Sequence, residues 1–225
     1  MSGMRWFVLF CLVAALLLAG LGAWQLQRLG EKRALIARID TALGAPATAL
    51  PAALADPPAW DYRRVTVSGR YLPGPDQRLG PRVRERQAGV HVLTPFRLAD
   101  GRVLLVNRGW IPAGMAPPAA GDDDRLTGVL RTRFRRGAFV PEHQAGSDMW
   151  FWYDLPGLSA AWQRELMPAV LELDAGASGT NPPYAGTTVV DIPNNHLQYA
   201  LTWFALAGVV LVMLLVYRRQ RRSRA

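Results

Sequence analysis

The residue of this chain best suited to cofactor chemistry is His196, which stands where a long apolar segment begins. In a helix, positions three, four and seven apart share a face, so Tyr199, Ala200 and Trp203 lie on the same side as the imidazole. Such a stripe at the mouth of a membrane helix makes a niche for a flat, apolar and partly acidic ligand. Haem is such a ligand, because neutral imidazole is a common axial ligand of its iron and aromatic rings pack against its faces.

A second apolar segment near the N-terminal end supplies groups that face this niche. It ends in Trp24, Gln25 and Arg28, of which Trp24 and Arg28 are four positions apart, and Arg28 is suited to pair with a haem propionate. A plain helix–helix contact at the headgroup level explains the aromatic residues equally well, since tryptophan and tyrosine gather there. It explains less well an imidazole bracketed by the amides of Asn194 and Asn195. Both interpretations stay open on the residues alone.

Both apolar segments have the length and composition of membrane-spanning helices. Residues 6–27 and 192–217 carry no charge, and a bilayer core requires roughly 20 such residues in a helix. A cleaved signal peptide is the alternative for the first segment, but its apolar run is long and no small-residue cleavage site follows it. The expected organisation has five parts: a cytoplasmic N-terminus (1–5), a first membrane helix (6–27), a periplasmic α+β domain (28–191), an interfacial entry with a second membrane helix (192–217), and a cytoplasmic basic tail (218–225).

The distribution of charge sets the expected orientation and argues against nucleic acid as a partner. The tail 218–225 holds five arginines and no acid, which places the C-terminal end in the cytoplasm. Two membrane helices then return the N-terminal end to the same side and leave the segment 28–191 in the periplasm. That segment contains 20 of the 26 basic residues and all 17 acids, so it carries only +3 of the net charge of +9. The basic excess is therefore mostly membrane-flanking, where a nucleic-acid binder would need a basic face on the folded domain.

The central segment predicts a compact, mainly antiparallel β domain with one short helix. An Asp-Gly pair between two apolar runs, 89–98 and 102–111, indicates a hairpin of adjacent strands. The other expected elements are strands at 61–71, 125–134, 149–153 and 169–173, and a helix at 158–166.

No enzyme motif is recognisable in this domain, although His143 or His91 would serve an enzyme of the outer domain as an alternative. Arg108 and Trp110 end an apolar strand, where they could grip a carboxylate or instead close the core with a salt bridge. The only cysteine, Cys11, lies in the first apolar segment, so neither an internal disulfide nor a cysteine metal cluster is expected.

Four motifs closely resemble the Surfeit locus protein family, called Shy in yeast. They span residues 22–204 in one order: Gly-Ala-Trp-Gln-Leu-Gln-Arg at 22–28, Tyr-Arg-Arg-Val-Thr-Val-Ser-Gly-Arg-Tyr at 62–71, Leu-Leu-Val-Asn-Arg-Gly-Trp-Ile-Pro at 104–112, and Pro-Asn-Asn-His-Leu-Gln-Tyr-Ala-Leu-Thr-Trp-Phe at 193–204. Each motif is weak alone, but the four in this order between two apolar segments are specific.

The resemblance implies an assembly factor for haem–copper cytochrome c oxidase, not an enzyme. Such a factor binds haem a transiently and assists its insertion into the oxidase catalytic subunit, with His196 as the ligand candidate and iron held only through haem. Further implied partners are haem a synthesis enzymes and the lipid bilayer. The motif residues Arg108, Trp110, Asn194 and Asn195 have no assigned role. The alternative is a membrane-anchored scaffold that binds the oxidase subunit without handling haem.

The expected location is a bacterial plasma membrane. An imported mitochondrial protein should carry an arginine- and serine-rich presequence, whereas five residues precede Trp6.

Overall fold

The computed structural model describes residues 2–122, 124–177, 180–188 and 192–222. It divides into a helical unit, residues 1–39 with 190–225, and a β unit, residues 40–189. The predicted boundary between residues 191 and 192, and the last three residues of the predicted basic tail, lie outside the described residues.

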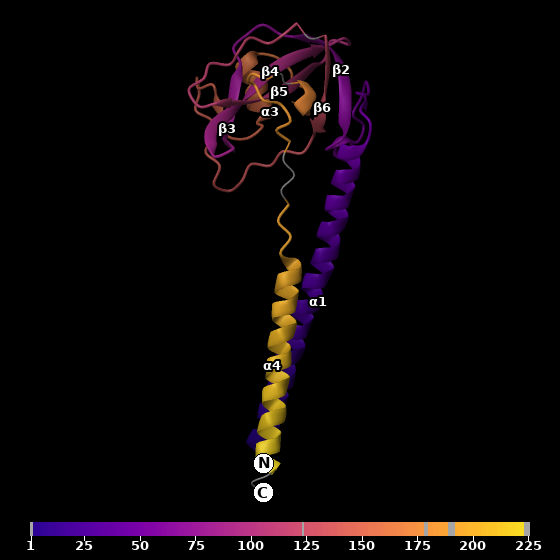
Figure 1. Ribbon diagram of the computed structural model, residues 1–225, viewed down its shortest axis with the longest axis vertical. Coiled ribbons are helices and arrows are strands. Elements are labelled where there is room, and N and C mark those ends of the chain that lie inside the picture. Colours follow the sequence, from indigo (N-terminus) through magenta and orange to yellow (C-terminus); the bar gives the residue numbers. More distant parts are fainter. Residues whose placement is uncertain (1, 123, 178–179, 189–191, 223–225) are drawn as a thin grey trace. The chain divides into compact units, whose positions relative to one another are not determined.

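The helical unit contains α4 (His196–Arg222) and α1 (Ser2–Gly44) except for residues 40–44 of α1, and the two helices run in opposite directions (Figure 1). Both are long and apolar enough to cross a membrane. The first span, expected at residues 6–27, is part of one continuous helix that runs on through the segment after Arg28. Two long apolar helices therefore flank the β unit in the sequence, and their insertion in a bilayer stays a prediction.

The buried residues along which α1 and α4 contact each other recur every seven positions. On α4 the residues of lowest exposure are Ala200, Ala207 and Leu214, and on α1 this spacing joins Ala15 and Leu29. A seven-residue repeat keeps one helix face turned toward a partner along its whole length. Three contacts fix the alignment: His196 with Gln25, Phe204 with Gly22, and Tyr217 with Phe7, whose ring centroids are 4.8 Å apart.

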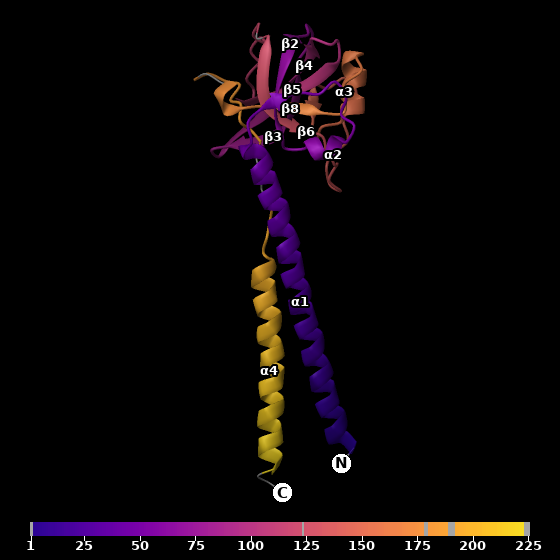
Figure 2. The same cartoon turned by 90° about the vertical axis from the view of Figure 1, so that its right-hand side faces the viewer.

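The β unit is built on a ring of five strands (Figure 2). In pairing order these are β2 (Arg64–Tyr71), β6 (Arg125–Arg131), β8 (Val170–Leu173), β5 (Val103–Pro112) and β4 (Gln87–Leu98). The ring closes where Gly69, Arg70 and Tyr71 of β2 pair with the end of β4. Closure leaves no open edge between these five strands.

The interior of this barrel is the larger hydrophobic core. All five strands turn alternate residues inward. The buried residues of this core are Val65, Val67, Phe96, Leu98, Leu104, Val106, Leu126, Leu130, Ala169, Leu171, Leu173 and Ala185. Full burial of a side chain the size of leucine or phenylalanine contributes about 1.5–3 kcal/mol. Trp60, from the short helix α2 (Pro57–Trp60), packs against this core.

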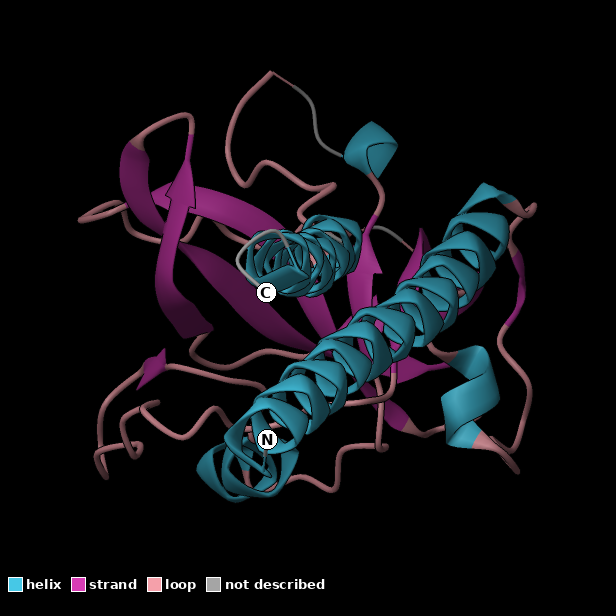
Figure 3. Cartoon of the chain, turned by 90° about the horizontal axis from the view of Figure 1, so that it is seen from below, coloured by secondary structure: helices cyan, strands magenta, loops and turns pink. Residues whose placement is uncertain are grey.

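A second core covers the outer face of β4, β5 and β8. It is formed with α3 (Leu155–Trp162), from which Leu158 and Trp162 are buried against residues such as Leu105 and Val170. The remaining elements are β1 (Thr48–Ala49) beside β2, β3 (Gln77–Arg84) beside β4, β7 (Met149–Trp150) beside β3, and a 3-10 turn, η1 (Ala175–Ala177). The strands occupy the centre of the β unit, and long loops surround them (Figure 3).

The structure confirms the predicted hairpin, since β4 and β5 pair from Gly89↔Pro112 to Arg97↔Val103. The helix expected at 158–166 begins three residues earlier, because the Asp154 carboxylate accepts a hydrogen bond from the Gly157 N–H and caps it. Gln163, in a left-handed conformation, ends it. Of the strand expected at 149–153, only Met149–Trp150 pairs, and β1 and β3 were not predicted.

Candidate functional site

The imidazole of His196 is anchored to the facing helix. Its Nδ1 lies 2.7 Å from the side-chain oxygen Oε1 of Gln25 on α1. An amide oxygen can only accept a hydrogen bond, so with Oε1 in this position Nδ1 acts as the donor. The second ring nitrogen, Nε2, then carries a lone pair, and none of the described residues hydrogen-bonds to it. This is the tautomer that an iron ion needs if it is to bind at Nε2.

The aromatic residues expected around His196 divide into two groups. Trp203 is half-buried on the side of α4 that faces α1, one turn beyond the buried Ala200. Tyr199 is 55% exposed and Trp24 is 52% exposed, so both rings lie at the margin of the helix pair. The structure therefore places His196 and Trp203 on one face of α4, two turns apart, and leaves Tyr199 and Trp24 exposed.

The polar residues at the same level have defined partners, with one exception. Arg28 forms an exposed ion pair with Glu31 at 2.6 Å. Asn195 immediately precedes α4, and its carbonyl oxygen accepts a hydrogen bond from the Tyr199 N–H. The buried side-chain oxygen of Asn194 has no hydrogen-bond partner among the described residues, so the helix pair leaves one acceptor unsatisfied.

Gln25 is the site residue that sequence reasoning did not select. Its signal was the seven-residue repeat of α1, in which Cys11, Leu18 and Gln25 occupy equivalent positions. A glutamine on an otherwise apolar helix face calls for a polar partner on the neighbouring helix. His196 occupies the corresponding face of α4.

Arg108 and Trp110 belong to the framework of the β unit. Arg108 is 7% exposed; its guanidinium donates to the carbonyl oxygens of Pro118 and Ala119 and pairs with Asp76. Trp110 is 3% exposed, and its backbone exchanges two hydrogen bonds with Tyr184, whose ring stacks on the indole. Of the two interpretations left open for this motif, the geometry favours closure of the core with a salt bridge.

His91 belongs to a buried polar chain on the outer surface of the barrel. Its Nδ1 lies 3.1 Å from the amide nitrogen of Asn107, which also donates to the Tyr153 hydroxyl. That hydroxyl donates to the Glu172 carboxylate at 2.9 Å, and Thr188 donates to its other oxygen. Burial, and then the nearby charge of Glu172, raises the pKa of Tyr153 well above 10. These links are structural and leave His91 without the accessible geometry of a catalytic base.

Acid is expected to destabilise the β unit through His91. Burial, with a contribution from the charge of Arg82, lowers the pKa of this imidazole from 6.5 to about 4. The unfolded chain therefore binds more protons between these values. We expect the His91 contribution to the free energy of unfolding to be intact above pH 6.5 and to fall by about 3 kcal/mol as the pH drops to 4.

Denaturant unfolding of the full chain, followed between about pH 7 and pH 4, measures this loss. Carboxylates contribute to the slope as well, so the useful quantity is the difference between wild type and His91→Gln. An identical pH dependence in the two proteins would contradict the prediction.

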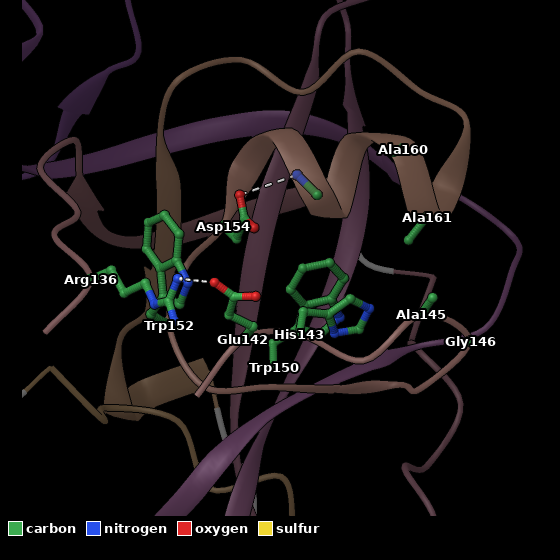
Figure 4. Close-up of a pocket in the computed structure, with 11 residues that line it drawn as sticks. Arg136, Glu142, His143, Ala145, Gly146, Trp150, Trp152, Asp154, Ala160 and Ala161 are labelled. Atoms are coloured by element: carbon green, nitrogen blue, oxygen red, sulfur yellow. Dashed lines mark hydrogen bonds and ion pairs between the residues drawn. The ribbon is translucent and has the colours of Figure 1, made fainter. Parts of the chain in front are cut away.

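His143 lines a surface pocket of about 590 Å³ beside α3 (Figure 4). Its ring stacks on Trp150 with centroids 3.6 Å apart, and its Nδ1 lies 3.1 Å from the carbonyl oxygen of Met149. Asp148, the acid that could have oriented it, pairs with Arg78. The lining, which contains no Ser, Thr, Cys or Lys, consists of Arg136, Glu142, His143, Ala145, Gly146, Trp150, Trp152, Asp154, Gly157, Ala160 and Ala161.

The charged side chains of this pocket already bind neighbouring residues. Arg136 binds the carbonyl oxygen of Val140 and the Glu142 carboxylate, and Asp154 caps α3. The described residues also contain no group of three His, Cys, Asp or Glu side chains arranged to hold a metal ion. The geometry gives no support to the enzyme alternative at either His143 or His91.

Known proteins share this sequence over most of its length. The model of the SURF1 family matches residues 12–208. A SURF1-like protein of Monosiga brevicollis is 36% identical over 244 residues, covering 100% of this chain and 91% of that protein. Surfeit locus protein 1 of Rattus norvegicus is 31% identical, covering 92% of this chain and 73% of the rat protein. A SURF1-like protein of Rickettsia felis is 30% identical, covering 94% and 96% respectively.

Proposed function

This chain belongs to the SURF1 family, and from that premise we propose that it is an assembly factor for haem–copper cytochrome c oxidase. It binds haem a transiently and assists its insertion into the catalytic subunit. The observation that carries the haem-binding part is the His196 imidazole, whose Nδ1 is hydrogen-bonded to Gln25 while none of the described residues hydrogen-bonds to Nε2. The part that concerns the oxidase rests on the resemblance described above.

The residues around His196 fit a haem group in chemical type. The imidazole supplies a nitrogen ligand, the half-buried Trp203 and the exposed rings of Tyr199 and Trp24 supply aromatic surface, and Arg28 supplies a cation. Arg28 is already paired with Glu31, but this ion pair is exposed and therefore weak, so a propionate can replace the glutamate. Haem, when bound, would supply an iron that an imidazole nitrogen such as that of His196 can ligate.

A carrier must also release its cargo. His196 offers one imidazole ligand, and the partly exposed rings beside it pack against a ligand without enclosing it. Affinity that depends on one ligand and open apolar contacts suits transfer to a deeper site with more ligands. This arrangement supports a handling role over permanent storage.

The setting that we propose is the bacterial plasma membrane, crossed by α1 and α4. Both helices have the required length and apolar composition, and the arginines that follow Tyr217 favour a cytoplasmic C-terminus. Both chain ends then lie in the cytoplasm and the β unit lies in the periplasm. His196, the first residue of α4, would stand at the periplasmic interface.

Purification of the full chain from cells that make haem a tests the proposal. We expect an absorption spectrum with the Soret and α bands of haem a, which should be absent when the same protein comes from cells that lack haem a synthesis. Extraction of the pigment and its identification by mass separate haem a from a precursor. Protein free of haem from cells rich in haem a, yet bound to the oxidase catalytic subunit, would overturn haem handling and establish the scaffold alternative.

A further inference from the structure

We propose that Gln25 is a positioning residue for His196: its side-chain oxygen fixes the imidazole as the Nδ1–H tautomer and keeps Nε2 available as a ligand atom. The inference rests on the proposed haem-handling function, which it deepens by naming the residue that prepares the ligand. The hydrogen bond is short, at 2.7 Å between Nδ1 and Oε1, and it joins residues 171 positions apart in the sequence.

The physical reason lies in the two forms of a neutral imidazole. One nitrogen carries the hydrogen and the other the lone pair, and the hydrogen-bond partner decides which is which. A side-chain amide oxygen beside Nδ1 stabilises only the form in which Nδ1 donates. Histidines that bind metals almost always make such a bond through their second nitrogen, which orients the ring and strengthens it as a donor to the metal.

The helix pair holds Gln25 in place for this task. Three residues before it, Gly22 lies against the ring of Phe204, and a Cβ atom at position 22 would come within 2.8 Å of that ring. This close approach fixes how α1 and α4 align at the level of His196. Gln25 and His196 are both half-buried there, so competition from water for their hydrogen bond is reduced.

The same turn of α1 contains a matched control. Gln27 is exposed, and its amide nitrogen donates to Glu31 at 3.3 Å, away from the imidazole. Replacing either glutamine with leucine removes the same polar group from the same helix. Only the change at position 25 removes the hydrogen-bond acceptor of His196.

The first measurement uses the full chain without haem. Labelling with ¹⁵N-histidine gives three imidazoles, from which His196→Ala identifies the signal of His196. At a pH where imidazole is neutral, we expect the wild type and Gln27→Leu to carry the hydrogen on Nδ1. Gln25→Leu should show a mixture of tautomers or the Nε2–H form, and Gln25→Glu should restore Nδ1–H.

The second measurement is the rate at which haem leaves for an excess of apomyoglobin. We expect this rate to rise about 10–100-fold in Gln25→Leu, the usual cost of losing the hydrogen-bond partner of a metal ligand. Gln27→Leu should match the wild type, and Gln25→Glu should retain haem. Circular dichroism checks that each variant keeps its helices.

The outcomes separate the inference from the proposed function. If Gln25→Leu keeps the Nδ1–H tautomer, or changes the tautomer but releases haem at the wild-type rate, the positioning role is overturned while haem binding stands. If wild-type protein never takes up haem, the proposed function is overturned. A tautomer that still responds to Gln25 would then support only the hydrogen bond itself.

Discussion

Full-length protein carrying His196→Ala is expected to lose its haem, with an affinity loss of more than about 100-fold. The loss of an outer hydrogen-bond partner costs a metal site about 10–100-fold, and the loss of the ligand itself should exceed this. No other histidine lies in either long helix, since His91 is in β4 and His143 is in the loop after β6. The Soret band should therefore vanish or shift to that of weakly associated haem.

Two further proteins make this result specific. His143→Ala removes an imidazole that stacks on Trp150 in the β unit, and it should leave haem occupancy unchanged. His196→Gly leaves a gap at the ligand position, so added imidazole should restore a haem band with a nitrogen-ligated spectrum. A His196→Ala protein with wild-type occupancy and an unchanged Soret band would exclude His196 as the ligand.

Gly109→Ala is expected to destabilise the β unit by roughly 3 kcal/mol, even though it adds a single methyl group. Gly109 has a φ of +125°, a conformation that residues with a side chain rarely adopt. A Cβ atom at this position would also overlap the backbone carbonyl of Tyr184. The strand would have to part from Tyr184, which breaks the two backbone hydrogen bonds to Trp110 and the ring stack over it.

Gly114→Ala is the matched control for this substitution. Gly114 also has a positive φ, +82°, but no atom lies within 4 Å of the place where its Cβ would stand. Its replacement carries backbone strain without overlap, so we expect a loss of about 1 kcal/mol. The midpoint of denaturant unfolding measures both effects, provided that the free energy of unfolding depends equally steeply on denaturant concentration in each protein. Equal losses at the two positions would contradict the importance of the contact with Tyr184.

The parts of the fold that the sequence predicted are those with strong local signals. The two apolar helices follow from length and composition, and the β4–β5 hairpin from an Asp-Gly turn between apolar runs. Strand β3 was missed because Gly80-Pro81 interrupts it and its arginines resemble a solvated loop. It forms because β4 extends beyond the barrel ring and offers it a partner, with a shift in register between Leu79 and Arg82.

The sequence predicted His196 as the candidate ligand, which stays a prediction, and it did not predict the residue that contacts His196. His196 stood out because an imidazole at the mouth of an apolar helix is unusual, and spacing placed Trp203 on its face. Trp24 and Arg28 were chosen because of their depth in the first helix. At this depth the structure shows a contact to His196 from a different residue, Gln25. The seven-residue repeat puts Gln25 on the face of α1 that meets α4, but which residue of that face touches His196 depends on the alignment of the two helices.

The seven-residue repeat of the helix pair makes this alignment a matter of discrete steps. Sliding α1 by one repeat would keep its packing face toward α4, but it would replace Gln25 opposite His196 with Leu18 or Lys32. Leucine offers no acceptor, and the lysine ammonium is a donor that would compete with the metal for the imidazole lone pair. Under the proposed haem-binding function, Gln25 therefore selects one alignment of the helix pair, because only that alignment places a hydrogen-bond acceptor opposite Nδ1 of His196.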